Sequence, residues 1–172
     1  MGILSGDQQK EPMHYGEVFS TWGYLTTSKG KVSAYQTFYN HAGDKDLRRL
    51  IENFLQQAQK ENTEIETLLK ANGVMLPPTP PERPNADLDS IPAGARFNDM
   101  EIAAALSADS AAGLIACSQI IGQCTREDIA TMFAQFHIQK LQLGSATLRL
   151  NKEKGWLIVP PLHTGQKELA HV

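Results

Sequence analysis

Cysteine is nearly absent from this sequence, with two residues in a chain of 172. Cys117 and Cys124 fall seven residues apart on one predicted helix, and about 10 Å of helical rise separates them, which exceeds the reach of a disulfide. Because seven residues span nearly two helical turns, both thiols share a face and are predicted as small core side chains. An intermolecular bridge or a reactive thiol is the alternative. Nothing in this pattern requires an oxidising compartment.

Surplus basic charge and long apolar runs are missing as well. The chain has 16 Lys and Arg against 19 Asp and Glu, a net charge of −3 and a pI near 5.9. Phosphate binding needs a concentrated basic face, so this balance argues against a nucleic-acid partner. No apolar run approaches the ~20 residues of a membrane span, and residues 113–122 are predicted as a short buried helix segment instead.

A targeting segment is not evident at the N-terminus. The first thirteen residues have no basic start and no long apolar stretch, so they do not fit a secretory signal. We therefore expect synthesis in the cytoplasm and a flexible arm over residues 1–12. Residues 163–172 are expected to form a C-terminal tail.

The motifs of common enzymes and metal proteins are missing too. There is no H-x-x-x-H, H-E-x-x-H or C-x-x-C spacing, and no G-x-S-x-G, P-loop or dinucleotide-binding glycine pattern. The sequence therefore assigns no catalytic residue, no cofactor-binding residue and no metal ligand.

What the sequence does have is helical periodicity. Apolar residues at spacings of three and four predict four helices, over residues 13–41, 45–72, 99–123 and 126–154. Three start signals support these bounds: Asp44 as an N-cap, and capping boxes at Asn98 with Glu101 and at Thr125 with Asp128.

Residues 74–97 differ in kind, because they hold six of the chain's nine prolines and cannot form a helix. About 24 extended residues could span roughly 80 Å, whereas a helix of ~27 residues is only about 40 Å long. The segment can therefore cross the whole bundle as a passive connector, with a proline-rich docking role for "PPTPP" as the alternative. Two antiparallel hairpins joined by one long crossover form an all-α, ferritin-like four-helix bundle in a single domain, 13–162. An up-down-up-down bundle with a loose middle loop is the other option.

Ferritin-like metal proteins carry a demanding signature, which this sequence meets only in part. Two helices each supply a Glu, and the other two each supply a Glu-x-x-His pair. His137 follows Ala134, not Glu, at this spacing, and the second helix offers Glu61 but no His. His137 is therefore predicted as an ordinary packing or rim residue.

A weaker pattern lies at mid-bundle level. Helical extrapolation places five polar residues there, on or beside the apolar faces: Lys29, Glu61, Asp109, His137 and Lys140. Buried charges must be paired, so these residues would form a buried polar layer or the remnant of a metal site. The alternative is that they face solvent.

Two apolar segments have no obvious partner. The stretch Trp156, Leu157, Ile158 and Val159 precedes a Pro-Pro pair, and we expect it to pack within the chain or across a dimer. The first helix carries aromatic residues on more than one face. These are predicted as core, with a dimer surface as the alternative.

Three stretches together resemble a known family. "GEVFSTWGYLTTSKGKVSAYQTFYNHAGDKDLRRLIE" resembles its first two helices, "LLKANGVMLPPTPPE" its hydrophobic-proline crossover, and "ATLRLNKEKGWLIVPP" its closing signature. The family is a Bacillus domain of unknown function, number 3231, whose members are described as candidate spore coat proteins with ferritin-like folds. The resemblance covers about residues 14–162. It implies a helical bundle, a role in sporulation, a place in the spore coat and no established enzymatic activity.

Three functional hypotheses follow. The first is a non-enzymatic structural or interaction protein of the spore coat type, which forms a homo-oligomer, a dimer above all, and binds other coat proteins. The second is a manganese or iron oxidase or catalase relative, with Glu61, Asp109 and His137 as surviving ligands. The third is a bundle that binds a small apolar ligand, and it predicts a pocket near four small residues: Ala103, Ala104, Ala111 and Ala112.

Overall fold

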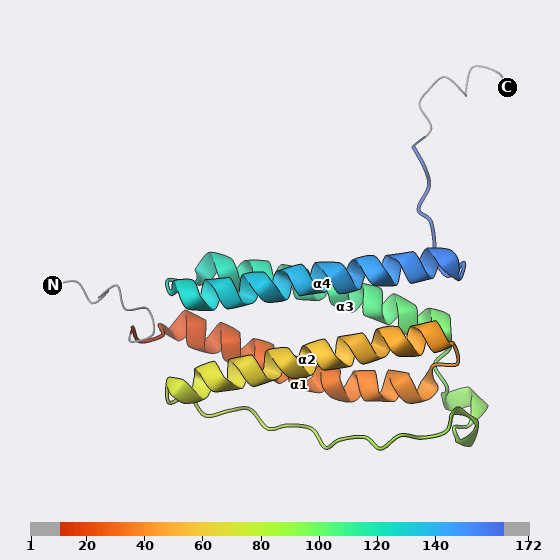
Figure 1. Ribbon diagram of the computed structural model, residues 1–172, viewed down its shortest axis with the longest axis horizontal. Coiled ribbons are helices and arrows are strands. Elements are labelled where there is room, and N and C mark those ends of the chain that lie inside the picture. The colour runs from red at the N-terminus through yellow and green to blue at the C-terminus, as the bar shows by residue number, and fades with distance from the viewer. Residues whose placement is uncertain (1–10, 164–172) are drawn as a thin grey trace.

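The computed structural model describes residues 11–163 and consists of two long helical hairpins packed against each other (Figure 1). The helices are α1 Tyr15–His41, α2 Lys45–Ala71, α3 Asp99–Gln123 and α4 Glu127–Glu153, with two short 3-10 helices at Leu88–Ser90 and Ala93–Ala95. No β-strand occurs among the described residues. Each long helix begins and ends within two residues of its predicted bounds.

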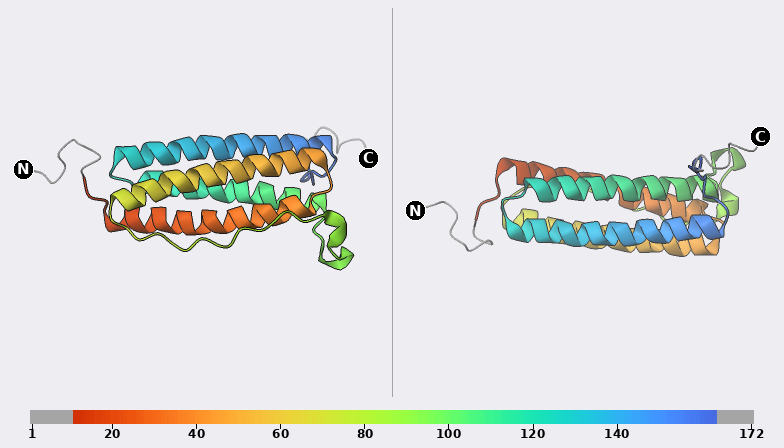
Figure 2. Two further views of the ribbon diagram at one scale, coloured as in Figure 1. Left: turned by 60° about the horizontal axis from the view of Figure 1, so that its bottom comes forward. Right: turned by 90° about the horizontal axis from the view of Figure 1, so that it is seen from above.

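The hairpins are arranged as the crossover length predicted. α1 packs on α2 and α3 packs on α4, while α1 lies beside α3 and α2 beside α4. The crossover starts where α2 ends and returns along the bundle, so that α3 runs in the same direction as α2 (Figures 1 and 2). The predicted all-α bundle with one long crossover is confirmed. The up-down-up-down alternative is wrong.

The crossover is held along α1 by side chains that reach its backbone. Trp22 Nε1 donates to the carbonyl of Met75 at 2.9 Å, and Asn40 Nδ2 donates to that of Pro84 at 3.0 Å. Between these points Gln36 Oε1 accepts from the backbone N–H of Arg83. A segment rich in proline has few N–H groups to satisfy, so these few bonds fix it in its extended form.

The start of α4 differs from the prediction. The expected box of Thr125 with Asp128 does not form, because Arg126 is the N-cap and has no side-chain cap. Instead Glu17 Oε1, from the first turn of α1, accepts from the backbone N–H groups of Thr125 at 2.8 Å and Arg126 at 2.9 Å. Asp128 pairs with the Arg126 guanidinium at 2.6 Å. The predicted N-cap at Asp44 and the predicted capping box of Asn98 with Glu101 are confirmed.

The apolar core is divided in two along the bundle. One cluster surrounds Phe54 and Leu106, and the other surrounds Phe133 and Phe136. On α2 the first cluster ends at Ala58 and the second resumes at Ile65. The gap on each helix is filled by polar side chains, which form the site described below.

Both cysteines are free, as the sequence predicted for small core residues. Cys117 is buried in α3, and Cys124 is the half-buried C-cap of that helix. Burial raises the pKa of the Cys124 thiol to about 11 and also raises the pKa of Cys117. Both thiols are therefore protonated at neutral pH, which disfavours the alternative of a reactive thiol.

The C-terminal apolar segment packs only in part. Trp156 lies against the Phe54 cluster and Leu157 is half-buried. Ile158 and Val159 are 86% and 59% exposed, so the expectation that they pack within the chain is wrong. Packing of these two residues across a dimer stays a prediction. Residues 1–10 of the predicted arm and residues 164–172 of the predicted tail lie outside the described residues.

The composition of α3 is unusually apolar for a helix with so much exposed surface. By length and composition alone, Ala93–Gln123 would be long and apolar enough to cross a membrane, a test that core helices of soluble proteins also pass. No continuous apolar run of that length is visible in the sequence, because small and polar residues interrupt the apolar ones. Only a third of the apolar window is buried inside the bundle, so α3 has an apolar face left over.

Candidate functional site

The centre of the bundle holds a buried ion pair. Lys140 Nζ donates to Glu61 Oε2 at 2.8 Å, and the Glu61 side chain is completely buried. The Tyr24 hydroxyl donates to the same oxygen at 2.9 Å, while Gln57 Nε2 donates to the other at 3.0 Å. Glu61 thus has a partner on both oxygens, as a carboxylate in a low-dielectric interior requires.

The layer continues towards α3 through Asp109. Its carboxylate forms an ion pair with Lys31 and accepts a hydrogen bond from the Tyr35 hydroxyl. Burial, with Glu61 next in effect, raises the pKa of Tyr24 far above its ordinary value, and burial with Asp109 does the same for Tyr35. Both hydroxyls therefore stay protonated and act as donors to the carboxylates.

The structure brings together part of the predicted polar layer. Glu61 and Lys140 form its centre, and Asp109 lies at its edge with a side chain that is 20% exposed. Lys29 is buried but turns to the opposite side of α1, where its ammonium pairs with Glu66 and donates to the carbonyl of Pro77. His137 is half-buried and makes no hydrogen bond or ion pair to the described residues, so it does not belong to the layer.

These residues do not fit a metal site of the ferritin type. No group of three or more His, Cys, Asp and Glu side chains comes together among residues 11–163. The carboxylates that lie inside the bundle are each held by an ammonium group, a guanidinium neighbour or backbone N–H groups. In a ferritin-type site, a carboxylate at this position would bind a metal ion. Here the Lys140 ammonium occupies that place beside Glu61.

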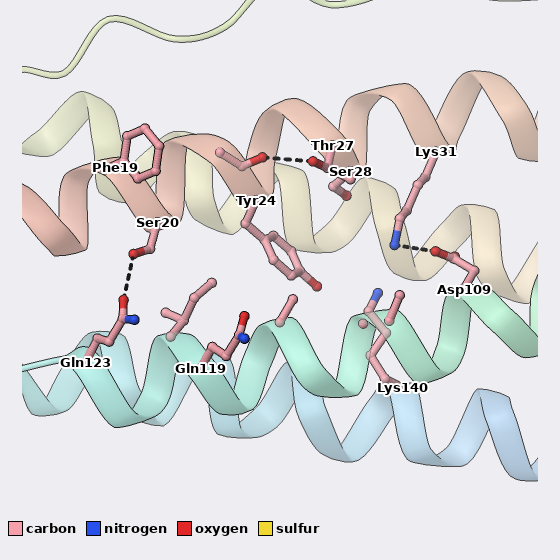
Figure 3. A pocket seen from close by; sticks show the side chains of 15 residues that line it. Phe19, Ser20, Tyr24, Thr27, Ser28, Lys31, Asp109, Gln119, Gln123 and Lys140 are labelled. Atoms are coloured by element: carbon pink, nitrogen blue, oxygen red, sulfur yellow. Dashed lines mark hydrogen bonds and ion pairs between the residues drawn. The ribbon is translucent and has the colours of Figure 1, made fainter.

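A cleft of about 590 Å³ opens between α1 and α3, and Tyr24, Asp109 and Lys140 of this layer line it (Figure 3). It is lined by small residues on both helices, among them Gly23, Ala112, Gly113 and Ala116. A pocket lined by small residues is thus present, as predicted. Its predicted position is wrong in part, because only Ala112 of the four alanines lines it. Ala103 is buried in the core, and Ala104 and Ala111 are exposed.

Sequence reasoning missed the glycines that make the cleft. A Cβ on Gly113 would come within 3.0 Å of Lys140 Cδ, so the glycine lets the lysine side chain cross α3. A Cβ on Gly23 would meet nothing within 4 Å, because that position faces the open cleft. The signal available in the sequence was a glycine inside each of two strongly apolar helices, a position that usually has a packing or functional reason.

Comparisons with known proteins agree with this fold over almost the whole chain. Residues 1–169 match the family model described as "Protein of unknown function (DUF3231)". The chain belongs to this family. The uncharacterized protein YvdQ of Bacillus subtilis (strain 168) is 54% identical over 163 residues, which cover 95% of this chain and 96% of that protein.

A solved structure is also similar. It is a crystal structure from Bacillus halodurans C-125 described as a "putative spore coat protein". It is 59% identical, covers 92% of this chain and 100% of its own, and superposes with a TM-score of 0.91. The family resemblance found in the sequence is therefore confirmed, together with the helical bundle.

The misfit of the metal site has a direct consequence in solution. We expect the protein, purified without chelator after expression with added manganese and iron, to retain either metal at far below one ion per chain. His137→Ala should leave the metal content unchanged, because His137 has no carboxylate partner in the bundle. Elemental analysis by mass spectrometry measures both. Near-stoichiometric metal that disappears in His137→Ala would instead restore the oxidase or catalase hypothesis.

Proposed function

We propose that this chain is a non-enzymatic structural protein of the spore coat type, which assembles with copies of itself through the outer face of the α3·α4 hairpin. The observation that carries the proposal is an exposed apolar face on that hairpin, next to a bundle interior that is closed by its own ion pairs. The likeness to a protein described as a spore coat protein supports the setting.

The outer apolar face is built from residues at helical spacing. It comprises Ala104, Ala108, Ala111 and Ile115 on α3, and Ile138, Leu141 and Leu148 on α4. Ile115, Ile138 and Leu141 are 61%, 55% and 54% exposed. Spacings of three, four and seven residues place each set on one side of its helix.

Charge is missing from this face. Between Ile102 and Gln123 the one Asp, Glu, Lys or Arg is Asp109, and between Ile129 and Leu148 it is Lys140. Both turn into the bundle, towards their own partners. An uncharged apolar face is complementary to another of its kind, so a second copy of the chain is its best-matched occupant.

The size and texture of the face also suit a dimer. The two helices are about 38 Å long and their axes lie some 9 Å apart, so the outer surface of the hairpin measures roughly 700 Å². A standard interface buries about 800 Å² per partner. Alanines let the helices of two copies approach closely, and the larger Ile and Leu side chains can fill the spaces between them.

The proposal predicts a dimer that a charge on this face abolishes. We expect the wild-type chain to sediment as a dimer at micromolar concentration and Ile115→Lys/Leu141→Lys to sediment as a monomer with unchanged helical circular dichroism. Met75→Lys, at a position 86% exposed on the crossover and outside the face, is the matched control and should remain dimeric. Analytical ultracentrifugation distinguishes these states.

The same variants test the role in the coat. A fluorescent fusion expressed in a sporulating Bacillus host should form a ring at the spore surface. The double-lysine variant should stay diffuse, and Met75→Lys should behave as wild type. A wild-type chain that is monomeric at all concentrations and diffuse in sporulating cells would refute the proposal.

A further inference from the structure

We propose that the cleft between α1 and α3 binds a single-chain amphiphile with an acidic oxygen head, of the class of medium-chain fatty acids. The cleft opens on a different side of α3 from the outer apolar face. The inference therefore goes beyond the assembly role, and neither proposal depends on the other.

The cleft has the shape of a channel closed at both ends. At one end the Ser20 hydroxyl donates to Gln123 Oε1 at 3.4 Å, and at the other Lys31 pairs with Asp109 (Figure 3). Eleven residues of α1 separate the two bridges, which is about 16 Å of helical rise. With C–C bonds of about 1.5 Å, that length accepts an extended chain of roughly a dozen carbons. The volume of about 590 Å³ is in the ordinary range of ligand sites, about 300–1,000 Å³.

The end of the cleft near Gln123 combines apolar side chains with the polar side chains of Ser20, Gln119 and Gln123. Phe19 and Ile120 line it, with Ala116 deeper along the same wall. Phe19 is 79% exposed on α1, an unusual position for a large aromatic side chain. An alkyl chain in the channel would cover part of that ring and the small residues of α3.

The other end offers hydrogen-bond donors that the protein itself leaves unused. Lys140 is 7% exposed, and its ammonium donates once, to Glu61, so two of its three N–H groups have no acceptor among the described residues. Ser28 is 4% exposed, and its hydroxyl likewise has no hydrogen-bond partner in residues 11–163. Both line the cleft together with Lys31.

The charges on the wall select the head group. The side chains that line the cleft include two ammonium groups, Lys31 and Lys140, and one carboxylate, Asp109. Glu61 lies behind Tyr24 and is not part of the lining. Buried donors with spare N–H and O–H groups call for an acceptor, and hydrogen bonds from an ammonium group are strongest to an anionic oxygen.

The direct test is titration of the protein with dodecanoate below its micellar concentration. Calorimetry measures the binding, and thermal unfolding measures the change in melting temperature. We expect saturable binding of one molecule per chain and a higher melting temperature. Gly23→Leu places a side chain in open cleft space and should weaken binding at least tenfold. Gly30→Leu is the matched control on the same helix. That glycine is exposed, does not line the cleft and has no atom within 4 Å of a built Cβ, so binding should be unchanged.

The head group is tested with an uncharged ligand and a second variant. Dodecan-1-ol should bind at least fivefold more weakly than dodecanoate to the wild-type protein. Lys31→Met should remove most of that difference and leave dodecan-1-ol binding unchanged. Equal affinity of the wild type for the two ligands would overturn the acidic head, and absence of saturable binding, or full binding by Gly23→Leu, would overturn the site.

Discussion

Lys140→Met should lower the free energy of unfolding by about 3–5 kcal/mol, because it leaves the Glu61 carboxylate buried without its cation. Glu61 is fully buried and Lys140 is 7% exposed, and the methionine that replaces the lysine offers the carboxylate no hydrogen bond. For a chain of this size the melting temperature should fall by roughly 10 °C. Chemical denaturation monitored by circular dichroism measures the loss.

A double variant separates the charge effect from lost packing. Lys140→Met/Glu61→Gln removes both charges but keeps an amide oxygen to accept from the Tyr24 hydroxyl. We expect it to recover at least half of the lost stability, since an uncharged pair carries a smaller desolvation cost. Lys60→Met, at the exposed neighbouring position on α2, is the control and should change stability by less than about 0.5 kcal/mol. A double variant less stable than Lys140→Met would contradict this account of the pair.

Glu17→Ala should cost about 2–4 kcal/mol, because one carboxylate caps α4 from another helix. It accepts from the backbone N–H groups of Thr125 and Arg126 and, through its other oxygen, from that of His14 at 3.1 Å. Removing it takes the acceptor from three backbone N–H groups, of which that of Arg126 is buried, and bonds to charged groups contribute roughly 1.5–3 kcal/mol each. Glu101→Gln is a suitable control, because Glu101 completes a capping box at an exposed position and should change stability far less.

Glu17 should also determine how the free energy of unfolding depends on pH under acidic conditions. Burial alone would raise the pKa of the Glu17 carboxyl, but the backbone N–H groups of Arg126, Thr125 and His14 outweigh it, and the pKa lies below 4.5. Because the pKa of Glu17 is lower in the folded than in the unfolded state, its ionised form stabilises the fold. This stabilisation is complete above pH 4.5 and is lost as the pH falls through the folded-state pKa. The stability difference between wild type and Glu17→Gln should therefore be constant near neutral pH and shrink below pH 4.5. A difference independent of pH would show that Glu17 is not ionised.

Protein groups alone supply the hydrogen-bond and charge partners of these two carboxylates. Glu61 takes its cation from α4, and Glu17 accepts from two backbone N–H groups in the turn that precedes α4. Each ties the two hairpins together across the long crossover. The polar layer also divides the core into two clusters, which fixes the register of the helices, since a shift of one turn would separate Glu61 from Lys140.

The sequence by itself determined the four helices, their bounds to within two residues and the connectivity. Periodicity and local caps such as Asp44 and Asn98 depend on residues a few positions apart, and the length of the proline-rich segment limits the topology. It also placed Glu61 and Lys140 at the same level of the bundle, because the rise along each helix is fixed.

Only the tertiary structure decided which groups meet across helices. The turn before α4 carried a good local capping pattern, but Glu17, more than a hundred residues away, took the N–H groups instead. The Lys29 side chain contacts the crossover, and His137 lies outside the polar layer. One residue corresponds to a rotation of about 100° about a helix axis, so spacing alone does not predict which side a residue near the edge of a face takes. The cleft arose where Gly23 of α1 and Gly113 of α3 leave its walls without side chains. A missing side chain leaves space only if no neighbour fills it, and neighbours far apart in sequence are set by the packing of the whole bundle.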